Sequence, residues 1–325
     1  MREHRPSPLS WTALILLLAA SPIAAAGEQR SDGKSTPERP RVVRIGAVAY
    51  APSAVTIFED IRRYFDRRGM PVDYVLFSHY DALVEALRRG EVDIAWNTPL
   101  AHAQYHRKAG NASQALVMRD VDCNVRSVLV VRADASIRTP TDLAGQTLVL
   151  GSRQAAEATV LPVHFLMSQG VDFDRIKIHS LDGTADLRGN PCSSEVHVLA
   201  ALQEGKGQAG IIGERFWKHL SEREPERVSG LKVIWVSPPF SHCVFTASKD
   251  FDKDLAAQFT RLMLAMDPSD PLAAEAMRLE GTRRWVAGSQ EGFQELLKAL
   301  DESPACGSSA CESYTGERGL STRPE

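Results

Sequence analysis

The sequence predicts an α/β protein of two lobes, each a mainly parallel sheet flanked by helices, joined by two hinge crossings. Apolar strand-like runs alternate with amphipathic helical patterns through most of the chain. Such alternation builds right-handed β-α-β units and a mainly parallel sheet. The alternation begins again after the turn signal Thr139–Leu143, and a chain of 325 residues is long enough for about two domains. We therefore expect one lobe for each run.

The first run contains five expected strands and three helices. The strands are expected at 42–48, 72–77, 92–96, 114–118 and 127–132. The first helix follows Ser53, and the apolar residues expected to share its inner face are Val55, Phe58, Ile61 and Phe65. A second helix is expected over Tyr80–Arg89. Pro99 opens the third helix at the position that proline favours.

The second run continues the same pattern and returns to the first lobe. Strands are expected at 147–151, 176–180, 208–212, 233–237 and 244–247, and helices at 154–168, 194–204, 253–266, 271–280 and 290–301. This order predicts that residues 41–131 and 238–302 form lobe 1 and that residues 132–237 form lobe 2. Ser127–Arg132 and Val233–Ala247 are then the expected hinge crossings.

Both ends of the chain differ in composition from the rest. Residues 1–26 combine a basic start at Arg2 and Arg5, an apolar run from Thr12 to Ala20 and three small residues at 24–26. This is the order of a cleavable signal peptide, and the apolar run is far shorter than the roughly 20 residues that span a bilayer. Residues 27–40 and 303–325 are polar and rich in Ser, Gly and Pro, so we expect a flexible leader and a disordered tail. The mature protein is expected in the periplasm.

Charge and cysteine content exclude several functional classes. Lys and Arg number 38 against 41 Asp and Glu, a net charge of −3, and no long basic run is present, so nucleic acid is not expected as a partner. The five cysteines are Cys123, Cys192, Cys243, Cys306 and Cys311. Cys306 and Cys311 are close enough to close a small loop, and an odd count leaves at least one thiol unpaired. We expect no cofactor, no structural zinc site and, without a catalytic motif, no enzyme.

Three loops that follow strands carry hydroxyl side chains. These loops are Ser78–Tyr80, Asn97–Pro99 and Gly151–Arg153, with Thr159 further along the helix after the third. In open α/β sheets, ligands bind beyond the carboxyl ends of the strands. Free N–H groups at a helix start, aided by a Ser or Thr hydroxyl, can bind an anion there. The alternative is that these side chains only cap their helices.

Three segments resemble a known family. They are Gly90–His102, with the sequence GEVDIAWNTPLAH, Thr141–Thr147, with TDLAGQT, and Val196–Gly210. All three are similar to motifs of the PhnD-like phosphate/phosphite/phosphonate periplasmic solute-binding proteins, which have the type 2 periplasmic-binding fold. The resemblance covers roughly residues 41–300. It implies a monomeric Venus-flytrap protein that closes on a tetrahedral oxyanion and delivers it to an ABC transporter permease or to a sensor protein.

The same resemblance implies which residues contact the ligand. Tyr80, Thr98, Ser152 and Thr159 match anion-holding positions of the family. Alanines at 155, 156 and 158 stand where the family commonly has hydroxyls, which would weaken the binding of a dianionic phosphonate. Glu195 lies near a polar contact position, where a carboxylate repels an anion unless it meets an amine or a hydroxyl of the ligand.

Cys123 indicates a second possibility within this family. A thiol is a poor phosphate ligand but bonds directly to soft centres such as trivalent arsenic. The sequence is also similar to a branch of arsenite-sensing (AioX-like) proteins that signal to a membrane histidine kinase, which implies arsenic(III) binding by a Cys123 thiolate. We expect Arg119 and Arg126 to lower the pKa of this thiol and to hold hydroxyl oxygens. Burial or disulfide bonding of Cys123 is the alternative. His242, beside Cys243, is expected either to line the cleft or to hydrogen-bond across the hinge.

Overall fold

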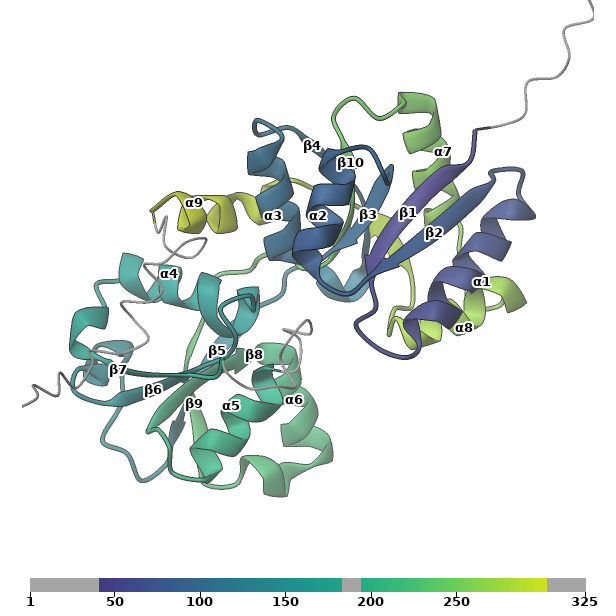
Figure 1. The fold of residues 1–325 in the computed structure, drawn as a ribbon. Helices are drawn as coiled ribbons and strands as arrows, with labels where there is room; N and C mark the ends of the chain where they lie inside the picture. Colours follow the sequence, from purple (N-terminus) through teal and green to yellow (C-terminus); the bar gives the residue numbers. More distant parts are fainter. Residues whose placement is uncertain (1–40, 183–193, 303–325) are drawn as a thin grey trace, which may run out of the picture. The chain divides into compact units, whose positions relative to one another are not determined.

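The computed structural model describes residues 41–182 and 194–302, which form two separate sheets (Figure 1). The first sheet has six strands in the order β11-β4-β10-β3-β1-β2, and the second has five in the order β7-β6-β8-β5-β9. The expected α/β class with two sheets is confirmed. The expected signal peptide, leader and tail, and three of the five cysteines, Cys192, Cys306 and Cys311, lie outside the described residues.

The first sheet is built from both ends of the described chain. Its strands are β1 (Val43–Val48), β2 (Val72–Phe77), β3 (Ile94–Asn97), β4 (Ser113–Arg119), β10 (Val244–Ser248) and β11 (Trp285–Ala287). Strand β1 pairs in parallel with β2 and β3, whereas β10 lies antiparallel between β3 and β4. The helices of this part are α1 (Ala54–Asp66), α2 (Tyr80–Arg88), α3 (Pro99–Lys108), α7 (Lys253–Leu264), α8 (Pro271–Leu279) and α9 (Gln294–Glu302).

The second sheet is formed by the middle of the chain. Its strands are β5 (Ser127–Arg132), β6 (Thr147–Leu150), β7 (Lys177–Ser180), β8 (Ala209–Gly213) and β9 (Leu231–Val236), and its helices are α4 (Leu161–Ser168), α5 (Ser194–Gln203) and α6 (Glu214–Arg223). Strand β5 pairs antiparallel with β8 and with β9. The chain therefore changes from the first sheet to the second before Ser127, not after residue 131 as the sequence analysis expected.

Apolar periodicity predicted most elements correctly, with three differences. Val55 of α1 is 55% exposed, because the buried face of this helix centres on Ile57, Phe58 and Ile61 and leaves Val55 at its edge. The helix expected over 154–168 is instead a π-helical turn at Ala156–Val160 followed by α4, with Pro162 in the first turn of α4. Proline fits the first turn of a helix because the N–H that it lacks would have no partner within the helix there. The sequence analysis also missed α6 and the three-residue strand β11.

Two extended segments connect the sheets, and they pair with each other. Residues 120–126 lead from β4 to β5, and residues 237–243 lead from β9 to β10. Val125 and Phe240 exchange two backbone hydrogen bonds of 2.9 Å, and the N–H of His242 donates to the carbonyl of Asp122 at 2.8 Å. The Ser127 N–H donates to Oγ of Ser237 at 2.9 Å. These bonds hold the two segments, called the crossings below, side by side.

No helix in the described parts of the chain has both the length and the apolar character needed to cross a bilayer.

Candidate functional site

A pocket of about 660 Å³ lies at the crossings. It is lined by Arg119, Val121, Asp122, Cys123, Asn124, Val125, Arg126, Glu157, Glu195, Gly213, Glu214, Arg215, Phe216, Lys218, His219, His242, Glu280 and Gly281. This volume is in the range that holds small molecules, roughly 300–1,000 Å³. Charged side chains from both sheets contribute to the wall, so the electrostatics of the pocket decide which ligands it can hold.

The structure brings four of the eight residues expected to bind ligand to this pocket. Cys123, Arg126, Glu195 and His242 line it, and Tyr80, Thr98, Ser152 and Thr159 are not among its lining residues.

The four other residues lie near the helix starts that follow strands. Thr98 caps α3, and its Oγ1 accepts from the N–H of Ala101 at 3.3 Å. Oγ of Ser152 accepts from the N–H of Gln154 at 3.2 Å. Tyr80 is the first residue of α2. The buried hydroxyl of Thr159 has no hydrogen-bond partner among the described residues.

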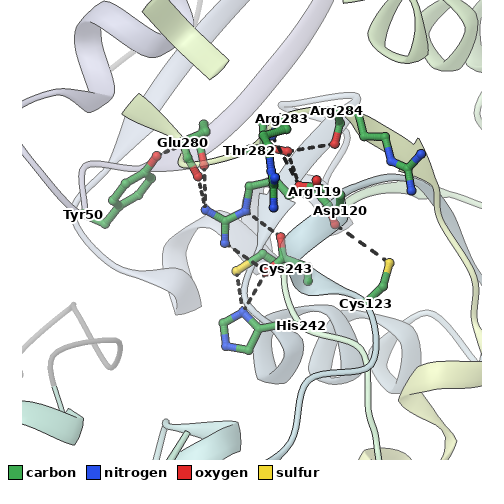
Figure 2. Close-up of polar contacts among 11 residues, drawn as sticks. Tyr50, Arg119, Asp120, Cys123, His242, Cys243, Glu280, Thr282, Arg283 and Arg284 are labelled. Carbon is green, nitrogen blue, oxygen red and sulfur yellow. Dashed lines mark hydrogen bonds and ion pairs between the residues drawn. The ribbon is translucent and has the colours of Figure 1, made fainter. Parts of the chain in front are cut away.

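Arg119, at the end of β4, holds two buried carboxylates. Its Nε and Nη2 donate to Asp122 at 2.6 and 2.9 Å, and its Nη1 donates to the Glu280 carboxylate at 3.1 Å (Figure 2). The hydroxyl of Tyr50 donates to the other oxygen of Glu280. Burial raises the pKa of Glu280, although the charge of Arg119 opposes the rise. The guanidinium is thus fully engaged by protein carboxylates.

His242 joins the two crossings to the π-helical turn. Its Nδ1 lies 3.3 Å from Asp122 Oδ1, and its Nε2 lies 3.0 Å from Glu157 Oε2. Burial alone would lower the pKa of His242, but its interactions with Cys243, Glu157 and Asp122 hold the pKa well above the usual value. At neutral pH the ring is therefore an imidazolium that donates to a carboxylate on each side.

The two carboxylates that His242 contacts are ionised. Burial would raise the pKa of Asp122, but hydrogen bonds and charge from His242 and Arg119 lower it to about 2. Burial would also raise the pKa of Glu157, but the charge and hydrogen bond of His242 lower it. The imidazolium of His242 is consequently neutralised by two carboxylates whose pKa values are lowered.

Glu195, on α5, has a raised pKa, unlike Asp122 and Glu157. Burial, followed by the nearby charge of Glu157, raises its pKa to about 8. Its Oε1 accepts from the N–H of Gly213 at 2.5 Å, and a Cβ at position 213 would lie only 2.4 Å from that oxygen. A larger residue at 213 would therefore displace the Glu195 carboxyl from this position. Near neutral pH, Glu195 is mostly a neutral carboxylic acid and offers the pocket one O–H donor.

Cys123 is a free, partly buried thiol in the first crossing. Burial, then the charges of Asp122 and Asp120, raise its pKa, so the expectation that Arg119 and Arg126 lower it is wrong. The physical reason is that Arg119 is engaged by Asp122 and Glu280, and Nη1 of Arg126 donates to the carbonyl of Ser237 at 2.7 Å. Cys123 Sγ lies 3.8 Å from the carbonyl oxygen of Arg119, in the geometry of a weak S–H donor.

Several residues of this network were missed by the sequence analysis. They are Tyr50, Asp122, Glu157 and Glu280. Glu157 carried a usable signal, because it is the only charged residue in the apolar run 155–163 and such a residue is rarely buried without a partner. Tyr50 and Glu280 carried no such signal, because they lie far apart in the sequence and only the fold brings the Tyr50 hydroxyl to the Glu280 carboxylate.

Comparison with known proteins agrees with the fold. The probable ABC transporter phosphite-binding protein PhnD1 of Prochlorococcus marinus is 20% identical over 273 residues, which cover 79% of this chain and 88% of that protein. The structure of PhnD1 in complex with methylphosphonate superposes with a TM-score of 0.60 at 18% identity, covering 82% of this chain and 99% of that one. The structure of XAC2383 of Xanthomonas citri bound to ATP superposes with a TM-score of 0.65 at 17% identity, covering 81% of this chain and 98% of that one.

These structural likenesses establish the type 2 periplasmic-binding fold. The family model described as the periplasmic substrate-binding protein of phosphonate ABC transporters matches residues 47–293. Because this match covers most of the sequence, the chain belongs to the family of phosphonate ABC transporter periplasmic substrate-binding proteins.

Proposed function

We propose that this protein captures a small oxyanion or oxyacid in the pocket at the crossings and presents it to a membrane partner, either an ABC permease or the periplasmic part of a sensor kinase. It binds its ligand without transforming it. Family membership supports the class of function, and the charged wall of the pocket supports the choice of ligand within that class.

The balance of charge in the pocket favours a ligand that is neutral, singly charged or zwitterionic. Arg119 and His242 are each compensated by two carboxylates. Arg126, which is half-buried, and Arg215, which is exposed, line the pocket and form no ion pair with an Asp or Glu among the described residues. The half-buried guanidinium of Arg126 beside the ionised Glu157 is a poor match for a dianion, whose buried charge would remain partly unpaired. A protonated Glu195 can donate its O–H to an oxygen of the ligand. The observation that carries the proposal is that protein carboxylates already engage both Arg119 and His242.

A second candidate, capture of trivalent arsenic, rests on Cys123. Arsenous acid is uncharged near neutral pH and would not be repelled by the carboxylates. Its reaction with the thiol is a condensation in which an S–As bond forms, an As–O bond breaks and the thiol proton leaves with the hydroxide as water. Because this step starts from a neutral thiol and a neutral acid, the raised pKa of Cys123 does not prevent it. Arg126 and Glu195 would then hold the remaining hydroxyls.

Isothermal titration calorimetry of the mature protein tests both ideas. The ligands are phosphite, methylphosphonate, 2-aminoethylphosphonate and arsenite, with a phosphine as the reductant because dithiols chelate arsenite. Binding of at least one ligand supports the proposed function, and binding of none contradicts it. A preference for methylphosphonate at a pH where it is a dianion would contradict the preference for ligands of low net charge but not the proposed function.

Cys123→Ser separates the two candidates. If arsenite binds through the thiol, this variant loses arsenite binding and keeps its affinity for any phosphorus ligand. Undiminished arsenite binding by Cys123→Ser would reject the thiol mechanism. Neighbouring permease genes would favour transport, and a neighbouring histidine-kinase gene would favour sensing.

A further inference from the structure

Three potential metal ligands of different chemistry meet where the crossings join. They are a carboxylate oxygen of Asp122, Nδ1 of His242 and Sγ of Cys243, and these atoms all lie within 4.8 Å of one another. Asp122 comes from the first crossing, and the other two residues end the second. The hydrogen bond of 2.8 Å from the His242 N–H to the Asp122 carbonyl fixes the two backbones beside each other. The three side chains therefore converge because of the fold itself.

Two of the three spacings between these atoms are close to those of a tetrahedral zinc site. Zinc lies about 2.3 Å from sulfur and about 2.0–2.2 Å from nitrogen and oxygen, so ligand atoms in a tetrahedron are about 3.3–3.6 Å apart. Nδ1 of His242 lies 3.2 Å from Cys243 Sγ and 3.3 Å from Asp122 Oδ1. A cation in place of the Nδ1 proton would lie near both acceptors with little movement of the ligands. Figure 2 shows the contact between His242 and Cys243.

The groups around the three ligands are those that accompany metal sites. A metal-binding histidine commonly donates its second ring N–H to a carboxylate, and ligating carboxylates are themselves hydrogen-bonded. His242 Nε2 lies 3.0 Å from Glu157 Oε2, and Arg119 donates to both oxygens of Asp122. When Nδ1 gives up its proton to a cation, the contact with Glu157 keeps the remaining proton on Nε2. The two bonds from Arg119 fix the orientation of the Asp122 carboxylate.

Charge and burial also favour a cation. The side chains of Asp122 and His242 are only 3% and 12% exposed, and Cys243 is buried. With Cys243 as thiolate and His242 neutral, Asp122, Glu157, Glu280 and the thiolate outnumber the single positive charge of Arg119. A divalent cation would neutralise most of this excess. Thiolate and imidazole ligands favour zinc and related soft divalent cations over magnesium or calcium.

We propose that Asp122, His242 and Cys243 form a binding site for a thiophilic divalent cation of the zinc type, with the fourth coordination position left to water or to an oxygen of a pocket ligand. Binding displaces the proton from Nδ1 of His242 and the proton of the Cys243 thiol, while the proton on Nε2 stays shared with Glu157. The metal-site proposal depends on these three residues and does not depend on which solute binds in the pocket.

Cobalt(II) titration tests this site, because cobalt occupies zinc sites and a thiolate ligand gives it an intense near-ultraviolet absorption band. The protein is stripped with a chelator, reduced, and used with Cys192, Cys306 and Cys311 changed to Ser, which leaves Cys123 and Cys243 as the only thiols. We expect the band to appear at one equivalent of cobalt and to vanish when zinc is added. Cys243→Ser in this background should abolish the band, and Glu157→Gln should weaken cobalt binding about 10- to 100-fold.

A band that persists after Cys243→Ser would assign the sulfur ligand to Cys123 and overturn the proposal, as would the absence of any band in the parent. Because changes at the crossings can impair folding, zinc-edge X-ray absorption on the unaltered full chain provides an independent measurement. One sulfur with nitrogen and oxygen neighbours supports the site. No sulfur, or more than one, contradicts it.

Discussion

The helix starts that follow strands and the crossings use polar residues in different ways. At the helix starts, the hydroxyls of Thr98 and Ser152 accept from backbone N–H groups of their own turns. At the crossings, Asp122 and His242 bond to side chains from distant parts of the chain. All of the pocket's charged residues except Arg119, Glu157 and Glu280 lie at the crossings or on α5 and α6. The first arrangement completes local structure, whereas the second gathers charges that only the tertiary fold brings together.

The difference has a physical cause. A helix start leaves free N–H groups that the nearest hydroxyl can satisfy, so a Ser or Thr there is used locally. Apart from a 3-10 turn at Asp120–Asp122, the crossings contain no helix or strand, so they offer no row of free helix N–H groups for their side chains to satisfy. Buried charges there are stable only when distant partners compensate them. This difference is why we propose the ligand site at the crossings, and the following changes test the difference itself.

The largest expected effect is that of His242→Gln. It removes the cation between Asp122 and Glu157, which leaves the buried Glu157 without a charged partner and Asp122 with Arg119 alone. We expect the free energy of unfolding to fall by about 3–5 kcal/mol, measured by denaturant titration with a chelator present. Adding Glu157→Gln to this variant should recover part of the loss. A loss below about 1 kcal/mol would mean that water reaches these carboxylates.

A smaller loss is expected from Tyr50→Phe, which removes the hydroxyl that donates to Glu280. Hydrogen bonds to charged groups contribute about 1.5–3 kcal/mol and those to neutral groups about 0.5–1.5 kcal/mol. Tyr64→Phe is the matched control, because the Tyr64 hydroxyl donates to the neutral carbonyl of Leu262 at 3.1 Å. Unfolding experiments should show the larger loss for Tyr50→Phe. Equal losses would remove the distinction between the charged network and an ordinary core.

The pH dependence of stability should change in Glu195→Gln. The pKa of Glu195 is about 8 in the folded protein and that of an ordinary glutamate is lower, so the folded state holds a proton that the unfolded state releases. This group's contribution to stability is complete below about pH 4.3 and declines as pH rises toward about 8, by at most about 1.4 kcal/mol per pH unit. Glutamine removes the decline, so the variant gains stability relative to the parent as pH rises. Parallel pH profiles would contradict the protonated state.

The smallest expected effect is that of Thr98→Ala. Loss of this helix cap should cost about 1 kcal/mol of stability, and Thr98→Ser, which keeps the hydroxyl, should cost less. Calorimetry should find the affinity for the pocket ligand unchanged in both variants. A loss of affinity at unchanged stability would instead support the family-derived role of Thr98 as a ligand contact.

Local pattern was sufficient to predict most of the fold. The spacing of apolar residues predicted the bounds of β1 (Val43–Val48) and α2 (Tyr80–Arg88) to within one residue. Burial of one face of an element requires apolar residues at regular positions nearby in the sequence. The sheet to which β5 belongs was not predictable, because its alternation is the same whichever partner it pairs with. The site was half predictable for a similar reason. Cys123 and Glu195 stood out by chemistry, but the link from Asp122 through His242 to Glu157 joins residues far apart in the sequence.

Hydrogen–deuterium exchange of the whole protein, with and without the ligand identified by calorimetry, tests the placement of the ligand most directly. We expect ligand to slow exchange in peptides covering 119–126, 195–219 and 239–244, since these segments line or frame the pocket. Slower exchange confined to 79–83, 97–101 and 151–160, with the crossings unaffected, would place the ligand at the helix starts and contradict the account given for this site.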